Sequence, residues 1–333
     1  MRPAADVRGP RPTAPTGIRR GCRTLARVCA ALKPGERALV LSEPATRSLG
    51  AALAGEAAAA CGAAEHLTIA APRMHGAEPR DDAARRLRRA DVVFCLTRMS
   101  LAHSRACRSA LARGARWLSL PDYSAKVLEG PALTADFRAL SAPAERLAAA
   151  LTAGSRLEVF TEAGTSLTCL ILGRRGNPAP GWCPGPGTLA SPPDAEVNIA
   201  PVEGSAEGVV VVDGSIPHPR LGLLDKPLRL NVREGRIVGF AGPLSRVLEE
   251  LFASARNPDA RMLGEVGLGL NPRAALCGSM LEDEGTAGTV HFGFGSNATI
   301  GGSVNAGFHL DHVVRGPRVR IDGRPISLGG KRP

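Results

Sequence analysis

The sequence has 333 residues and a formal net charge of +11, with 44% hydrophobic and 22% charged residues. A chain of this length usually divides into two domains, and the composition is that of an ordinary globular protein. Aromatic residues make up only 3%, which leaves no stacking platform for bases, so we expect no nucleic-acid partner despite the positive charge. No apolar run approaches the roughly 18–20 residues that span a bilayer, and no signal peptide is visible. We therefore expect a cytoplasmic protein with no membrane partner.

The first part of the chain alternates between helices and strands. Residues 1–17 are rich in Pro, Arg and small residues that cannot bury a core, and we expect a disordered tail there. After this tail, the alternation of helices and strands is typical of βαβ units, so residues 18–150 are predicted to form an α/β domain with a parallel sheet. The predicted helices cover residues 18–35, 47–63, 79–90 and 102–115, and the predicted strands cover residues 36–43, 65–71, 91–97 and 116–120.

The second part of the chain reads mostly as strands and turns. A hairpin is predicted over residues 155–173, and a helix over residues 243–256 interrupts the strands that follow. We expect residues 151–330 to form a mainly antiparallel β (α+β) domain that binds metal and carries the catalysis. Neither a phosphate-binding glycine motif nor a serine nucleophile motif is present, so the α/β half is expected to be a scaffold or a substrate wall.

The stretch GTVHFGFGSNATIGGSVNAGFHLDHVV, residues 288–314, gathers three histidines in a glycine-rich, apolar setting. Because side chains alternate along a strand, His309 and Asp311 are expected to share one face and could bind one metal ion, whereas His312 points away. For this motif alone, a structural histidine paired with the carboxylate is the alternative. Acidic residues in apolar runs are costly to bury unless they are paired or bind a cation. The acidic residues of this kind are Glu196, Glu265 and Glu284, and together with His291 and the H-x-D pair they suit a metal centre.

Four segments make a family resemblance specific: AEVNIAPVEGSAEGVVVVDGSI, ARMLGEVGLGLNP, LEDEGTAGTVHFGFGSN and GFHLDHVV. In their order and neighbours they resemble the thermophilic metallo-aminopeptidase family (aminopeptidase T and S type), whose superfamily includes 2,5-dihydroxypyridine 5,6-dioxygenase. The resemblance implies a homodimer and a site with two divalent metal ions, Zn, Co or Mn. The implied ligands are Glu196, Glu265, Glu284, His291, His309 and Asp311.

The resemblance favours a metal-dependent hydrolase that cleaves the amide bond of a small peptide or another small amide substrate. A metal-activated water would attack the carbonyl carbon, and Glu265 would be catalytic by relaying the proton of that water. One departure concerns a tyrosine that the aminopeptidases carry shortly after the first histidine. This sequence has Ala298 near that place, and its only tyrosine is Tyr123 in the other half.

The alternative function is a mononuclear Fe(II) extradiol-type dioxygenase that cleaves a hydroxypyridine-like ring. Two histidines and one carboxylate form a triad that leaves coordination positions open for oxygen and substrate. His291, His309 and Asp311 have this composition. The missing tyrosine favours the dioxygenase, whereas the three retained glutamates favour the hydrolase. A binding protein that has kept the fold is the third hypothesis.

Overall fold

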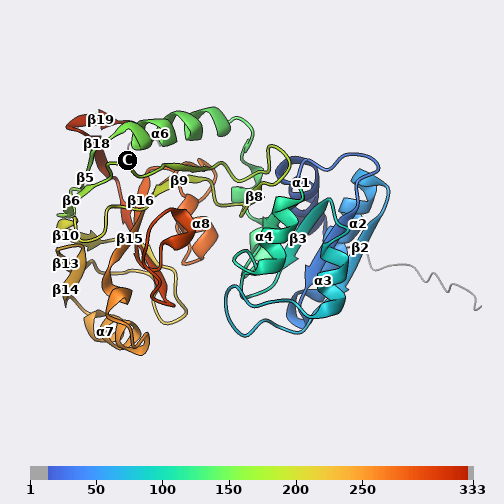
Figure 1. Cartoon of the computed structure of the whole chain (residues 1–333), viewed down its shortest axis with the longest axis horizontal. Helices are drawn as coiled ribbons and strands as arrows, with labels where there is room; N and C mark the ends of the chain where they lie inside the picture. Colours follow the sequence, from blue (N-terminus) through green and yellow to red (C-terminus); the bar gives the residue numbers. More distant parts are fainter. Residues whose placement is uncertain (1–13, 329–333) are drawn as a thin grey trace, which may run out of the picture.

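The α/β half is built on a five-stranded parallel sheet in the order β2-β1-β3-β4-β8 (Figure 1). The computed structural model describes residues 14–328. Strands β1 and β3 are buried along their whole length, as expected for the continuous apolar runs of a parallel sheet covered on both faces. The strands are β1 (Ala38–Ser42), β2 (Ala64–Thr68), β3 (Val92–Leu96), β4 (Arg116–Ser119) and β8 (Leu189–Ala190).

Helices cover both faces of this sheet. Val40 and Phe94 pack with α1 and α2 in one apolar cluster, while Leu39 and Trp117 pack with α3 and α4 in another. Neighbouring residues therefore serve opposite faces, as the alternation of a strand requires. The helices of this half are α1 (Thr16–Thr24), continued by a π-helical turn (Leu25–Cys29), α2 (Arg47–Cys61), α3 (Asp81–Leu87), α4 (Arg105–Ala112) and α5 (Ala125–Glu129).

The second half contains two antiparallel seven-stranded sheets, here called sheet B and sheet C. Sheet B has the order β14-β13-β10-β6-β5-β18-β19, and sheet C has the order β12-β11-β17-β16-β15-β9-β7. The strands of sheet B are β5 (Arg156–Phe160), β6 (Ser166–Leu170), β10 (Glu207–Val212), β13 (Leu228–Arg233), β14 (Arg236–Ala241), β18 (Arg318–Ile321) and β19 (Arg324–Ile326). The strands of sheet C are β7 (Asn177–Ala179), β9 (Glu196–Ile199), β11 (Ser215–Ile216), β12 (Gly222–Leu223), β15 (Leu263–Gly269), β16 (Thr289–Gly295) and β17 (His309–Arg315).

The main core of the second half lies between sheets B and C. Leu157 and Leu167 of sheet B and Val266 and Phe292 of sheet C belong to the same buried cluster. Helices α6 (Ser141–Ala153) and α7 (Ser245–Ser254) add to this cluster, and α8 (Met280–Gly285) packs against β15, β16 and β17. Short 3-10 turns lie at Pro44–Thr46, Pro131–Thr134, Pro258–Arg261 and Ala298–Ile300. One face of sheet C is therefore committed to the core, which leaves its other face for the site.

The predicted fold class is confirmed, because a parallel α/β sheet precedes two antiparallel β sheets. The predicted disordered tail falls mostly on residues 1–13, which lie outside the described residues, and α1 begins within it at Thr16. The boundary predicted between residues 150 and 151 stays a prediction, since β8 returns from the second half to the first sheet. Among residues 14–328, the helices are all too short or too polar to cross a bilayer.

Candidate metal centre

The candidate site lies on the face of sheet C that turns away from the core. Strands β9, β15, β16 and β17 are neighbours in this sheet. Their alternating side chains divide sharply between the two faces, because residues i and i+2 of a strand point the same way. Apolar residues such as Val197, Val266, Phe292 and Val314 enter the core. The site face carries the predicted donors Glu196 (β9), Glu265 (β15), His291 (β16), His309 and Asp311 (β17).

Glycines opposite these donors leave the space in which the donor side chains meet. Gly267 pairs with His291, and Gly293 pairs with Glu265 on one side and with Asp311 on the other. A Cβ on Gly267 would overlap the His291 ring and lie 2.9 Å from Glu196 Oε2. A Cβ on Gly293 would lie 2.6 Å from His309 Nε2 and 2.8 Å from Asp311 Oδ1. The two glycines therefore line the site on the side of the sheet, and Gly293 lies between the strands that carry Glu265 and Asp311.

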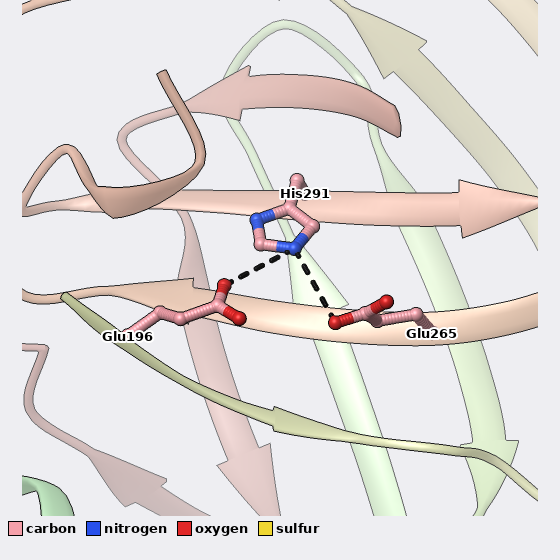
Figure 2. A group of neighbouring side chains, drawn as sticks. All are labelled: Glu196, Glu265 and His291. Atoms are coloured by element: carbon pink, nitrogen blue, oxygen red, sulfur yellow. Dashed lines mark ion pairs between the residues drawn. The ribbon is translucent and has the colours of Figure 1, made fainter. Parts of the chain in front are cut away.

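The donors form two groups that share Glu265. In the first group, His291 Nε2 lies 3.3 Å from Glu196 Oε2 and 3.8 Å from Glu265 Oε1 (Figure 2). In the second group, His309 Nε2 lies 3.4 Å from Glu265 Oε2 and 3.1 Å from Asp311 Oδ1. Within each group one donor atom per residue lies within 4.8 Å of the others, which suits a shared metal ion. The two histidines thus lie on opposite sides of Glu265 rather than in one group.

Glu284, the sixth predicted ligand, stands beside these two groups. It belongs to α8, which packs against β17, and it lies close enough to Asp311 for the two carboxyl groups to interact. Burial raises the pKa of Glu284 well above its ordinary value, and the charge of Asp311 adds to the shift. The structure therefore brings Glu284 to the centre as a neighbour of Asp311, outside both three-residue groups.

Two further polar residues were missed by the sequence analysis. Asp194 is buried, and burial together with the charges of Glu196 and Glu265 raises its pKa well above the usual range. Asn198 donates from Nδ2 to Glu196 Oε1 at 2.7 Å. Asn198 stands two positions after Glu196 in β9, so the alternation of the strand could have found it, whereas Asp194 precedes the strand.

The centre concentrates negative charge in a buried place. Burial raises the pKa of Glu196 to about 7, although His291 opposes the shift. Burial disfavours the charged form of His291, but Glu196 and the other carboxylates outweigh it and raise the pKa of His291 to about 9. Burial also opposes the ionisation of Asp311, yet the His309 imidazole beside it holds the pKa of Asp311 below its usual range. Carboxylates crowded in this way are stabilised by a cation.

The residues present fit a bound metal ion. Three buried carboxylate oxygens have no hydrogen-bond partner: Asp194 Oδ1, Glu196 Oε2 and Glu284 Oε1. His309 uses Nδ1 to contact the carbonyl oxygen of Ser296 at 2.9 Å. That contact fixes the ring and leaves Nε2 for an ion, as is usual for metal-bound histidines. Imidazole nitrogens and carboxylate oxygens suit Fe, Mn, Co and Zn, so the centre supports a metal cofactor.

One loop residue of the α/β half, His103, interacts electrostatically with His309 of β17. Partial desolvation lowers the pKa of His103, and the charges of His75, Arg108 and His309 add to the shift. His103 precedes Ser104, whose Oγ caps α4.

His312 lies on the core face of β17, where its ring stacks on Phe252 and contacts Phe294 edge-on. Its expected position away from the metal is confirmed, but it packs in the interior and does not face solvent.

The model of the family 2,5-dihydroxypyridine 5,6-dioxygenase matches residues 20–331, nearly the whole chain. The chain belongs to this dioxygenase family. A curated dioxygenase of this name from Pseudomonas putida KT2440 is 27% identical over 161 residues, which span 45% of this chain and 46% of the relative. The aligned part thus covers about half the length of that relative.

Two solved structures share the fold of this chain. The 2,5-dihydroxypyridine dioxygenase of Pseudomonas putida KT2440 has a TM-score of 0.80 at 21% identity, covering 95% of this chain and 97% of that one. AmpT from Thermus thermophilus, an aminopeptidase, has a TM-score of 0.68 at 17% identity, covering 95% and 98%. At these identities the two structures show a shared fold, and the family of the chain is that of the dioxygenase, not that of the aminopeptidases.

The prediction of an aminopeptidase-like, metal-dependent hydrolase is wrong, because the family that matches residues 20–331 is a dioxygenase family. The physical reason is that carboxylates and imidazoles bind a cation in both kinds of enzyme and do not select the reaction. The proton-relay role of Glu265 in amide hydrolysis is dropped with it. That the chain is an enzyme is supported by the same match.

Proposed function

We propose that the chain is an iron(II)-dependent dioxygenase that opens the ring of a hydroxylated pyridine. The family match over residues 20–331 carries the proposal, because this span contains every residue of the two donor groups. The relative from Pseudomonas putida is named 2,5-dihydroxypyridine 5,6-dioxygenase, and its name supplies the first compound to test. The activity and the substrate of this chain remain proposals, since the alignment covers 46% of that relative.

We assign one iron ion to the group of Glu265, His309 and Asp311. The His309 side chain is 30% exposed, whereas those of Glu196 and His291 are 7% and 2% exposed. A substrate can therefore approach the second group more readily than the first. One imidazole and two carboxylates leave coordination positions open for other molecules. Compared with the two-histidine triad expected from the sequence, Glu265 takes the place of His291.

When bound, iron would supply the one-electron chemistry with which molecular oxygen reacts with an electron-rich ring. The residues of the chain prepare the place for it. Gly293 leaves the space in which the three donors meet. The carbonyl oxygen of Ser296 holds the His309 ring at its Nδ1 atom, and Glu284 lies beside Asp311. Donors held in this way need little rearrangement when the ion binds.

Two further expectations accompany this proposal. The homodimer rests on the family resemblance and stays a prediction. The number of ions is also open to measurement, because Glu265 takes part in both donor groups. Our proposal commits to one iron, so a count of the bound metal tests it directly.

The decisive experiment is anaerobic loading of the purified protein with Fe(II), followed by oxygen uptake with 2,5-dihydroxypyridine. We expect about one iron per chain and consumption of one O₂ per ring, with loss of the aromatic absorbance of the substrate. Asp311→Ala should lose both iron and oxygen uptake. Asp225→Ala, a matched change at an exposed aspartate, should keep both. An iron-loaded protein that consumes no oxygen with hydroxylated pyridines would contradict the proposal.

A further inference from the structure

The two oxygens of the Glu196 carboxylate have different surroundings. Oε1 accepts a hydrogen bond from Asn198 Nδ2 at 2.7 Å. Oε2 is buried without a hydrogen-bond partner and lies 3.3 Å from His291 Nε2. The terminal torsion of a glutamate is soft, so a hydrogen bond to one oxygen fixes the plane of the carboxylate and thereby the direction in which the other oxygen points.

The orientation of Asn198 is itself determined by Asn177. The two residues are cross-strand partners in the pair of β7 and β9, and their side chains share one face. Asn177 Nδ2 donates to Asn198 Oδ1 at 3.2 Å and to the carbonyl oxygen of Ile300 at 3.2 Å. Because Asn198 Oδ1 accepts from Asn177, the Nδ2 group of Asn198 must face Glu196.

A continuous chain of contacts therefore joins an outer turn to the centre. It begins at Ile300 in the 3-10 turn Ala298–Ile300, runs through the two asparagines to Glu196, and continues to His291. His291 Nε2 also lies 3.8 Å from Glu265 Oε1, and Glu265 belongs to the group to which we assign iron. Asn198 is 8% exposed, so water does not readily replace its hydrogen bonds.

We propose that Asn198, oriented by Asn177, is a positioning residue that turns Glu196 toward His291 and so holds the ligand Glu265 in place. The inference rests on the proposed function, because it takes Glu265 as a metal ligand. Partners outside the coordination sphere typically change metal affinity by roughly 10–100-fold when they are altered. The asparagine pair would thus tune the metal from the β7 edge of sheet C, beside the turn at Ala298 where the aminopeptidases are expected to carry tyrosine.

The test uses Co(II) as a spectroscopic probe of the full-length, metal-free protein. Asn198→Leu keeps the approximate size of the side chain but removes its hydrogen-bonding groups without adding charge. Co(II) should bind this variant roughly 10–100-fold more weakly, with an altered visible absorption spectrum. Asn177→Ala should shift both quantities in the same direction by a smaller factor. The matched control is Asn231→Leu in β13, which contacts Arg229 on sheet B and should leave Co(II) binding unchanged.

Thermal unfolding of each metal-free variant separates positioning from simple support of the fold. If Asn198→Leu lowers the melting temperature while Co(II) affinity and spectrum stay those of the wild type, the inference is overturned and the proposed function stands. If the wild-type protein itself binds neither Co(II) nor Fe(II), both fail together. If Asn198→Leu does not fold, Asn177→Ala decides, and wild-type Co(II) binding by it overturns the inference.

Discussion

Gly293 lies directly opposite Asp311 in the antiparallel pair of β16 and β17, and a methyl group at Gly293 would enter the space between His309 and Asp311. We therefore expect Gly293→Ala to abolish metal binding, because its Cβ would lie 2.6 Å from His309 Nε2. Isothermal titration with Co(II) measures this. Gly55→Ala is the control, since nothing lies within 4 Å of a Cβ on this helical glycine. Normal Co(II) affinity in Gly293→Ala would show that the metal lies elsewhere.

Metal binding should stabilise the folded protein. The crowded carboxylates of the centre exist only in the folded state, so an ion that binds them shifts the unfolding equilibrium. At a free metal concentration about 100 times Kd, the expected gain in the free energy of unfolding is about 2.7 kcal/mol. Calorimetry with and without a chelator measures the gain. It should vanish in Asp311→Ala and persist in Asp225→Ala, and an equal gain in both variants would contradict the assigned ligands.

The stability of the protein should depend on the ionisation of Glu203. Burial alone would raise the pKa of Glu203, but hydrogen bonds from Ser303 N–H, the Asn297 amide and Arg174 outweigh it and lower the pKa to about 2. A lowered folded-state pKa gives stability that is fully present above the unfolded value near 4.5 and is lost as the pH falls toward 2.

Glu203→Gln should therefore lower the free energy of unfolding at pH 7 by roughly 2 kcal/mol, given the partial exposure of the site. Urea unfolding between pH 7 and pH 3 measures the difference from the wild type. This difference should be constant above pH 5 and shrink below about 4.5. Glu162→Gln, at an exposed hairpin turn, is the control. A difference that does not change with pH would refute the assigned role of Glu203.

Asn271 should be important for stability because it joins separate segments in the interior. It is fully buried, and its Nδ2 donates to the carbonyl oxygens of Ala132 at 3.1 Å and Pro193 at 2.7 Å. Asn271→Ala leaves both acceptors without this donor, which should cost about 2 kcal/mol or more in the free energy of unfolding. Urea denaturation tests this against Asn231→Ala, which should change stability by about 0.5 kcal/mol or less. Equal losses in the free energy of unfolding in the two variants would contradict this role of Asn271.

The sequence predicted most residues of the centre, but it did not predict the reaction that the centre serves. Strand alternation placed His309 and Asp311 on one face and His312 on the other, and the structure has them so. The same rule applied to Asn198 would have added one neighbour of Glu196. The role of Gly293 was beyond reach, because it depends on the register between three strands, which one sequence does not contain.

The predicted hydrolase function was wrong because the presence of all the metal-binding residues was taken as evidence for hydrolysis. All six predicted ligand residues are present, and the structure brings five of them into two groups that share Glu265, with Glu284 beside Asp311. This arrangement indicates a cation, but a cation serves hydrolysis and oxygen chemistry alike. The absence of a tyrosine near Ala298 was an observation in the sequence that pointed away from the aminopeptidases.

Strand β8 has a mechanical consequence for the centre. Leu189 and Ala190 are bound to β4 of the first sheet, and the same stretch of chain then enters sheet C at Glu196. Tyr123 also holds this stretch, donating from its hydroxyl to the carbonyl oxygen of Pro192 at 2.5 Å. A rotation of the α/β half that opened the molecule to let substrate in or product out would pull on a tether only a few residues long. Because this tether leads to Glu196, such a rotation would displace Glu196 before any other donor. Opening of the molecule and the binding of the ion are therefore coupled through the covalent chain.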